Sequence, residues 1–364
     1  MAFKGKNLLT TLVILFISTI TLLAQNEKPT AAQINAAKAM QAFEKKDYDG
    51  AIAFFKKALE TDKNNADYMY EIGLAYVMKK DFEKAITQLQ SITDLSTARD
   101  NYYQLLGNLY AERDDSVKAR ETYQAGLKRF PKSGRLRMEL ALLHLQHRML
   151  DEALDELEEG IQTDPTFPLN YYWAAQTYKG TNEKIWCELY GELFENLDPN
   201  SVRSDKMHLL VYDIFRVVFE DFEQSKKMTF SKVQKGSTDA SSTGPSFEDK
   251  YNEIMTASAN GLLFNRDFEI PIASIDTIRT RFITTWYKQK LNEKFPNAVF
   301  ERQNQIADNG LMRPYTYYIF GHAKPLEFED YLKKNKKEYD KLLEWIKAHP
   351  FTVTDKNKFS RFFY

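Results

Sequence analysis

Small and apolar residues recur along the first half of this chain at a fixed interval of 34 residues. The interval separates Ala51, Ala85, Ala119 and Ala153, and later Pro131, Pro165 and Pro199. Within each interval the apolar residues form two paired helical patterns, and a proline ends the later intervals because it cannot continue a helix. Asp47 and Asp81 lie in turns between the paired patterns, where they are suited to cap a helix. The pattern therefore predicts consecutive helical hairpins.

The repeats align when Ala32, Ala66, Asp100, Gly134 and Pro168 are taken as first positions. The eighth position then reads Ala39, Gly73, Gly107, Ala141 and Ala175, and the twentieth reads Ala51, Ala85, Ala119, Ala153 and Cys187. Small residues at both positions let two helices approach closely. These signature positions resemble the tetratricopeptide repeat family. The resemblance implies an all-α, right-handed solenoid of about five hairpins over residues 32–201, with a divergent fifth repeat.

Residues after 201 lack this period. Apolar residues at helical spacing within 202–233 predict a helix that caps the open end of the solenoid. A small-polar run at 234–246 predicts a linker or long loop. Residues 247–364 are expected to form a helical domain, to which no family is assigned.

Three segments of this C-terminal domain have the clearest helical patterns, at about 249–263, 274–294 and 326–348. The aromatic stretch 314–321 suits either a strand or a short buried helix, and the lack of a nearby partner strand favours the helix. The aromatic residues 359–364 either dock on this protein or form a tag read by another protein, and docking is favoured.

The N-terminal residues 1–24 have the three regions of a secretory signal, with two lysines before an apolar stretch. We expect cleavage between Ala24 and Gln25, and export to the periplasm or cell envelope. The alternative is an uncleaved anchor, which would be the chain's attachment to a membrane. Since Cys187 is the single cysteine, the exported chain can form no intramolecular disulfide.

Composition excludes several classes of protein. The chain has 364 residues, of which 43% are apolar, so it can bury a core and is not an intrinsically disordered sequence. Its 50 basic and 51 acidic side chains give a formal charge of -1. Such a balance provides no global field to attract nucleic acid, and we expect no nucleic-acid partner.

The resemblance also indicates which residues line the concave face, because positions 2, 5, 9, 12 and 13 of each first helix face inward in this family. The predicted peptide-binding groove consists of Met40, Tyr70, Leu74, Val77, Gln104, Asn108, Met138, Leu142, Tyr172 and Gln176. These side chains form an apolar trough with a few amides, which suits an amphipathic helix or an extended apolar segment of a protein partner.

Two features of this groove limit its interpretation. Family members that bind a C-terminal carboxylate use Lys and Asn at positions 5 and 9 of the first repeat, whereas this chain has Ala36 and Met40. That carboxylate clamp is therefore absent. The alternative to a partner is that the chain's own C-terminal half covers the same residues.

The sequence contains no hydrolase, metalloprotease, P-loop or dinucleotide-binding motif, so no enzyme, metal or cofactor is predicted. His144 and Cys187 occupy core positions of the repeat, and His147 has no third ligand beside it. The competing hypothesis is an enzyme of unrecognised type in the C-terminal domain, with the repeats as a targeting arm and His322 in a loop. A structural spacer is a third possibility.

Overall fold

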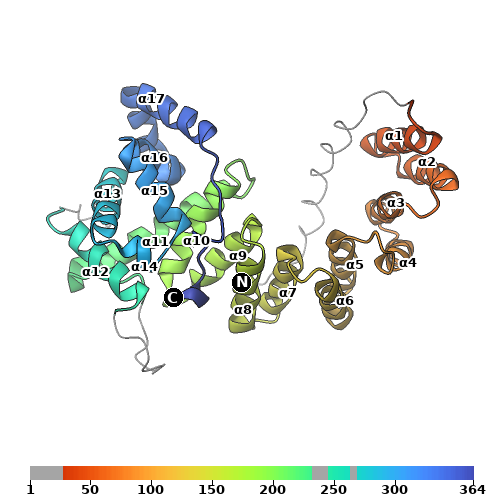
Figure 1. The fold of residues 1–364 in the computed structure, drawn as a ribbon, viewed down its shortest axis with the longest axis horizontal. Helices are drawn as coiled ribbons and strands as arrows, with labels where there is room; N and C mark the ends of the chain where they lie inside the picture. Colours follow the sequence, from red (N-terminus) through yellow and green to blue (C-terminus); the bar gives the residue numbers. More distant parts are fainter. Residues whose placement is uncertain (1–27, 232–244, 263–268) are drawn as a thin grey trace. The chain divides into compact units, whose positions relative to one another are not determined.

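The computed structural model describes residues 28–231, 245–262 and 269–364. The expected all-α fold is confirmed, since these residues form helices and no strand (Figure 1). The chain divides into two compact units, the first ending at Met149 and the second beginning at Leu150. The predicted signal and nearly all of the predicted linker lie outside the described residues. The domain limits expected from the sequence stay predictions.

The first unit contains three helical hairpins followed by one further helix. Its helices are α1 (Ala31–Glu44), α2 (Tyr48–Thr61), α3 (Ala66–Met78), α4 (Phe82–Thr93), α5 (Asp100–Glu112), α6 (Ser116–Arg129) and α7 (Gly134–Gln146). The first helix of each repeat begins within one residue of its expected first position. Leu89, Tyr123 and Leu136 lie in the core between hairpins, each at most 2% exposed.

The turn inside each hairpin repeats with the same backbone geometry. Lys46, Lys80, Asp114 and Arg148 lie 34 residues apart and all have φ of 60° or 61°. This left-handed conformation reverses the chain between two helices, although it is unfavourable for a residue with a Cβ atom. The next residue caps the second helix, because the carboxylates of Asp47, Asp81 and Asp115 accept from the backbone N–H three residues later. The expected caps at Asp47 and Asp81 are confirmed.

The eighth position of the repeat is a point of close helix contact. A Cβ atom built on Gly107 would lie 2.2 Å from the Tyr123 ring, and one built on Gly73 would lie 2.9 Å from Leu89. Neither gap admits a methyl group without movement of the facing side chain. The repeat therefore depends on the small residues that revealed it in the sequence.

The second unit contains ten α-helices in its described residues. They are α8 (Leu150–Thr163), α9 (Pro168–Tyr178), α10 (Lys184–Leu197), α11 (Ser204–Ser225), α12 (Phe247–Ala259), α13 (Ile272–Lys288), α14 (Leu291–Lys294), α15 (Ala298–Asp308), α16 (Met312–Phe320) and α17 (Pro325–Ala348), with short 3-10 helices η1 (Gly321–Ala323) and η2 (Arg361–Phe363). Helix α16 confirms the expectation of a helix at 314–321. Helix α15 was not expected.

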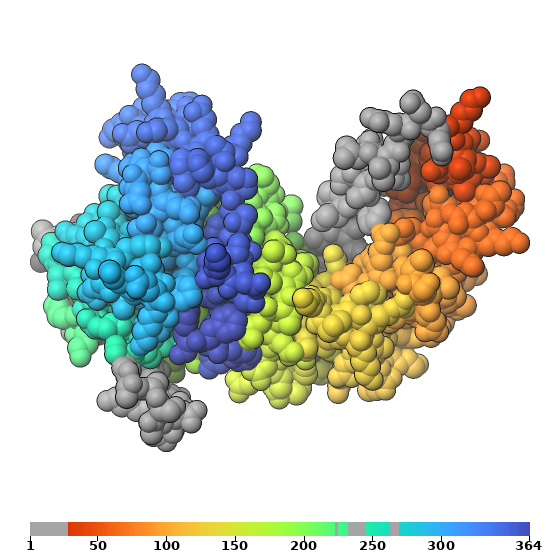
Figure 2. All heavy atoms as spheres, viewed as in Figure 1, coloured from red at the N-terminus to blue at the C-terminus, as the bar shows by residue number. Residues whose placement is uncertain are grey.

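Helix α10 is the centre of this second unit. Every residue from Ile185 to Glu195 is buried, because α9, α11 and α15 all pack against it. Helix α11 lies against α10, while residues 359–364 return to the surface of the same unit (Figure 2). A second helix of a repeat normally keeps one face in solvent. Here that face is covered.

Candidate functional site

Eight of the ten predicted groove residues belong to the first unit, where they lie on α1, α3, α5 and α7. Their exposure divides them by position in the repeat. The ninth position, occupied by Met40, Leu74, Asn108 and Leu142, is only partly buried in all four repeats. The remaining four, Tyr70, Val77, Gln104 and Met138, are each at most 6% exposed. The ninth position is therefore more exposed than the other predicted groove positions of the first unit.

Contacts between successive repeats explain why the fifth position is buried. The Tyr70 ring stacks on Tyr102 of the next repeat, with centroids 4.9 Å apart. The Tyr102 hydroxyl donates to Asp67 at 2.7 Å, and Arg99 donates to the same carboxylate at 2.9 Å. Aromatic stacking and these charge-assisted bonds join α3 to the start of α5. Substitution of Tyr70 would thus disturb the fold as well as any binding.

A second polar cluster joins α5 to α7. Gln104 Nε2 donates to the buried Glu139 carboxylate at 2.5 Å, and Arg135 donates to Gln104 Oε1 at 2.9 Å. Asn108 reaches Glu139 in either orientation of its amide, at 3.4 or 3.2 Å. The Tyr123 hydroxyl also contacts Asn108. Gln104 and Asn108, the two groove amides of the first unit, are consequently held in place by side chains of their neighbours.

Sequence reasoning missed the charged residues on this face. Burial raises the pKa of Glu139, and Gln104 and Arg135 oppose that shift. Burial, reinforced by Asp67, raises the pKa of Glu71 to about 7. The repeat pattern indicated these charged residues, because Arg135 and Glu139 occupy positions 2 and 6 of their repeat, as Asp67 and Glu71 do two repeats earlier. The predicted groove contained only aliphatic, aromatic and amide side chains.

The other two predicted groove residues, Tyr172 and Gln176, lie on α9 in the second unit. Tyr172 is 6% exposed and packs against Phe194, with centroids 5.3 Å apart, while the Arg203 guanidinium lies 5.6 Å from its ring. Gln176 is partly buried. Within this unit Tyr172 is a core residue.

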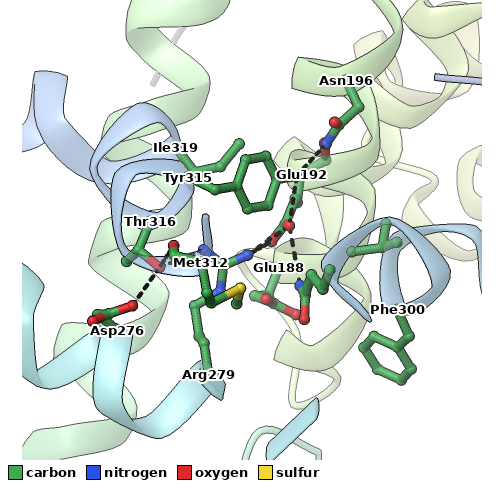
Figure 3. Close-up of polar contacts among 12 residues, drawn as sticks. Glu188, Glu192, Asn196, Asp276, Arg279, Phe300, Met312, Tyr315, Thr316 and Ile319 are labelled. Carbon is green, nitrogen blue, oxygen red and sulfur yellow. Dashed lines mark hydrogen bonds and ion pairs between the residues drawn. The ribbon is translucent and has the colours of Figure 1, made fainter. Parts of the chain in front are cut away.

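The most elaborate polar contacts surround Glu192 of α10 (Figure 3). Nη2 of Arg279 on α13 donates to both carboxylate oxygens, at 2.6 and 2.7 Å. Gln303 on α15 and the Tyr315 hydroxyl on α16 donate to the same carboxylate at 3.0 and 2.9 Å. Four helices therefore meet at one ion pair. Its strength comes from a charge-assisted geometry in which the buried oxygens have several donors.

Glu188 extends this polar centre by one helical turn. The Tyr251 hydroxyl donates to it at 3.0 Å, and burial together with the charge of Glu192 raises the pKa of Glu188 to about 8. Glu188, Glu192, Arg279 and Tyr315 are each at most 3% exposed. A substrate in solvent cannot reach side chains enclosed to this degree. The arrangement fastens α10 to the C-terminal helices.

A histidine pair lies between α11 and η1. His208 is buried and its Nε2 lies 3.2 Å from Glu195, while its ring stacks on His322 with centroids 4.8 Å apart. His322 Nδ1 lies 2.9 Å from Asp205, and this second imidazole is 53% exposed. The loop position expected for His322 is thus a short 3-10 helix.

Cys187 is fully buried on α10, and burial raises the pKa of its thiol well above the ordinary range. Such a thiol is a packing residue.

Within the described ranges no group of three or more His, Cys, Asp or Glu side chains could hold a metal ion. No described helix is long and apolar enough to cross a membrane.

Comparison with known families identifies the repeats. Two tetratricopeptide repeat models match the chain, over residues 42–109 and 105–166. The repeat type expected from the sequence is therefore confirmed.

Several curated proteins share this region. The Hsp70-Hsp90 organizing protein of Triticum aestivum is 31% identical over 167 residues, which is 45% of this chain and 27% of that protein. The BBSome complex member BBS4 of Bos taurus is 28% identical over 119 residues, covering 33% of this chain and 23% of that protein. The chain spans less than a third of the length of these relatives.

Several solved structures align with about half of the chain. The crystal structure of MamA protein has a TM-score of 0.37 at 22% identity, covering 48% of this chain and 94% of that one. The PilF structure of Pseudomonas aeruginosa has a TM-score of 0.44 at 17% identity, covering 54% of this chain and 87% of that one.

Proposed function

We propose that this tetratricopeptide repeat chain is an exported interaction scaffold that binds an apolar helical or extended segment of a protein partner through the first helices of its repeats. The observation that carries the proposal is the row at the ninth position. Met40, Leu74 and Leu142 remain partly exposed there, whereas Tyr70, Val77 and Met138 of the same predicted groove are buried. A partner that covers these side chains gains the free energy of removing apolar surface from water.

The polar groups beside this row support recognition of a specific segment. Asn108 stands in the same row and is held by Glu139 and Tyr123, so it presents a fixed amide to a partner. Arg135 on α7 and Glu71 on α3 add a cation and an ionisable carboxyl group to the first helices that carry this row. Apolar contacts provide affinity, whereas oriented polar groups select the partner and its direction.

The test replaces two side chains of this row. A Leu74→Asp/Leu142→Asp variant of the mature chain should capture at least about tenfold less of the partner from envelope extracts. Each leucine that the partner covers contributes roughly 1–2 kcal/mol to binding. Val117 is 61% exposed on α6, so Val117→Asp introduces the same charge away from the row and is the matched control. Equal capture by both folded variants would contradict the proposal.

Export is the second part of the proposal and has its own test. The apolar stretch after two lysines supports a cleavable signal. A mature protein that begins at Gln25 and fractionates with the envelope would support it. A full-length protein retained in the cytoplasm would reject export without affecting the binding proposal.

The competing proposal, a catalytic C-terminal domain, has one geometric argument. An accessible imidazole held by a carboxylate, as in His322 and Asp205, is an arrangement that can move protons. Any hydrolytic activity found in the wild-type chain should fall at least about a hundredfold in His322→Ala if this pair is the general base. Unchanged activity would remove His322 from consideration.

A further inference from the structure

Residues 359–364, named here the closing segment, contact the second unit as a peptide ligand contacts its receptor. The backbone N–H of Arg361 donates to Glu158 of α8 at 3.2 Å and to the Tyr190 hydroxyl of α10 at 3.0 Å. Glu158 is fully buried and also accepts from Tyr178 at 2.7 Å. A buried carboxylate that receives a backbone N–H fixes the position and direction of the segment.

Side chains of the closing segment occupy three further places on the receptor. The Arg361 guanidinium donates to Glu183 at 2.9 Å. The Phe359 ring stacks on Tyr190, with centroids 5.9 Å apart. The Tyr364 ring lies 4.4 Å from Phe247 of α12 and 6.1 Å from Trp186 of α10.

These contacts involve only part of the closing segment. Phe359 and Ser360 are at most 1% exposed, whereas Phe362 and Phe363 are 48% and 46% exposed. The contacts therefore specify an aromatic residue, an Arg two positions later, and an aromatic residue three positions after the Arg. The two phenylalanines between them contribute less.

The receptor surface is held together by contacts that do not involve the closing segment. Helix α10 packs on α9, α11 and α15, and α12 packs on α13, which in turn packs on α15. The Arg279 and Glu192 ion pair fastens the same helices. Residues 354–356, which lie between α17 and the closing segment, are exposed and outside any helix. The segment is thus a tethered element on a surface that has its own support.

We propose that this surface is a peptide-recognition site that is occupied in cis by the closing segment and accepts the same segment from a second copy of the chain. This site is separate from the row at the ninth position and does not depend on the function proposed for that row. A short tether gives the cis segment an effective concentration in the millimolar range, so a peptide in trans competes only weakly until the cis contacts are reduced.

The experiment uses the full chain and a fluorescein-labelled synthetic peptide with the sequence of residues 355–364. In a Phe359→Ala/Tyr364→Ala variant the cis segment loses both aromatic contacts, and the peptide should bind saturably by fluorescence anisotropy. Wild-type chain should bind the peptide at least about tenfold more weakly, because its own segment competes. Absence of saturable binding to the folded variant would overturn the proposal.

Sequence specificity is tested with two altered peptides. A peptide carrying Arg361→Glu should bind at least about tenfold more weakly, since it faces Glu183 with a like charge. A peptide carrying Phe362→Ala and Phe363→Ala should bind within about threefold of the parent, because these side chains are largely exposed. Introducing Glu183→Lys into the receptor should restore binding of the Arg361→Glu peptide. Equal binding of the Arg361→Glu and parent peptides to the unmodified receptor would refute the site.

A second measurement covers the case in which the double variant fails to fold. Hydrogen exchange of residues 359–364 is then followed in the wild-type chain with unlabelled peptide at millimolar concentration. Displacement of the cis segment should increase hydrogen exchange at the Arg361 N–H, which is bonded to Glu158 when the segment occupies the site. Unchanged protection of this N–H at saturating peptide would contradict replacement of the cis segment by the peptide.

Discussion

Glu139 in the first unit and Glu192 in the second are both nearly inaccessible, at 4% and 1% exposure, yet their surroundings differ. Glu139 accepts from the neutral amides of Gln104 and Asn108, and Arg135 donates to the Gln104 amide. Glu192 receives a guanidinium on both oxygens together with an amide and a phenol. The first arrangement borders a partly exposed row, whereas the second is enclosed by four helices.

The comparison shows that similar helices can serve two purposes. In the first unit, polar groups join neighbouring repeats while apolar side chains at the ninth position stay partly exposed. Where further helices cover that face, a buried charge requires its full set of donors, because an unpaired charge in a protein interior is strongly destabilising. Four substitutions test this distinction, from the largest expected effect to the smallest.

Arg279→Met should produce the largest loss of stability. It leaves the Glu192 carboxylate buried without its cation, which destabilises by about 3–5 kcal/mol, and we expect to see this in urea unfolding of the second unit. Arg281→Met is the matched control, because Arg281 is exposed on the same helix and donates to backbone carbonyls. Adding Glu192→Gln to Arg279→Met should recover part of the loss. A double variant as unstable as the sum of its two single variants would show that the ion pair is not the cause.

Gly107→Ala tests the packing beneath the open row of the first unit. The new methyl group would meet the Tyr123 ring at 2.2 Å, and moving this ring also shifts the hydroxyl that contacts Asn108. We expect a loss of about 1–3 kcal/mol in the urea unfolding of the first unit. Gly180→Ala adds a methyl group in the second unit, where the nearest atom lies at 3.7 Å, and should leave the unfolding of the first unit unchanged. Equal effects of the two substitutions would mean that the eighth position is not a close contact.

Much of the first unit could be predicted from the sequence because its contacts are local and repeated. Gly73 and Gly107 marked the helix crossings, and Asp47 marked a cap, each within one repeat. The contact between Arg279 and Glu192 spans 87 residues and depends on how α13 packs on α10, which no local pattern specifies. For the same reason the sequence indicated the ninth position as part of a groove but could not separate it from the buried fifth position.

The pH dependence of stability tests the carboxylate beneath the closing segment. Burial raises the pKa of Glu158 from its ordinary value to about 7, so the folded state holds its proton more tightly than the unfolded state. Stability is therefore expected to fall as the pH rises from about 4.5 through 7, by up to about 1.4 kcal/mol per pH unit. Thermal unfolding at pH 5, 6, 7 and 8 should show a shallower decline in Glu158→Gln than in wild type. Glu152→Gln, an exposed change on the same helix, should keep the wild-type slope.

The smallest change in stability is expected at a turn of the first unit, where the substitution should stabilise the fold. Lys46 has φ of 61°, a conformation that is unfavourable for a residue with a Cβ atom and neutral for glycine. Lys46→Gly should therefore stabilise the first unit by about 0.5 kcal/mol, measured by urea unfolding. Its neighbour Lys45 has φ of -78°, so Lys45→Gly only adds freedom to the unfolded chain and should destabilise. If both substitutions destabilised equally, the left-handed turn would carry no strain, and the 34-residue spacing of these turns would reflect side-chain contacts instead of backbone geometry.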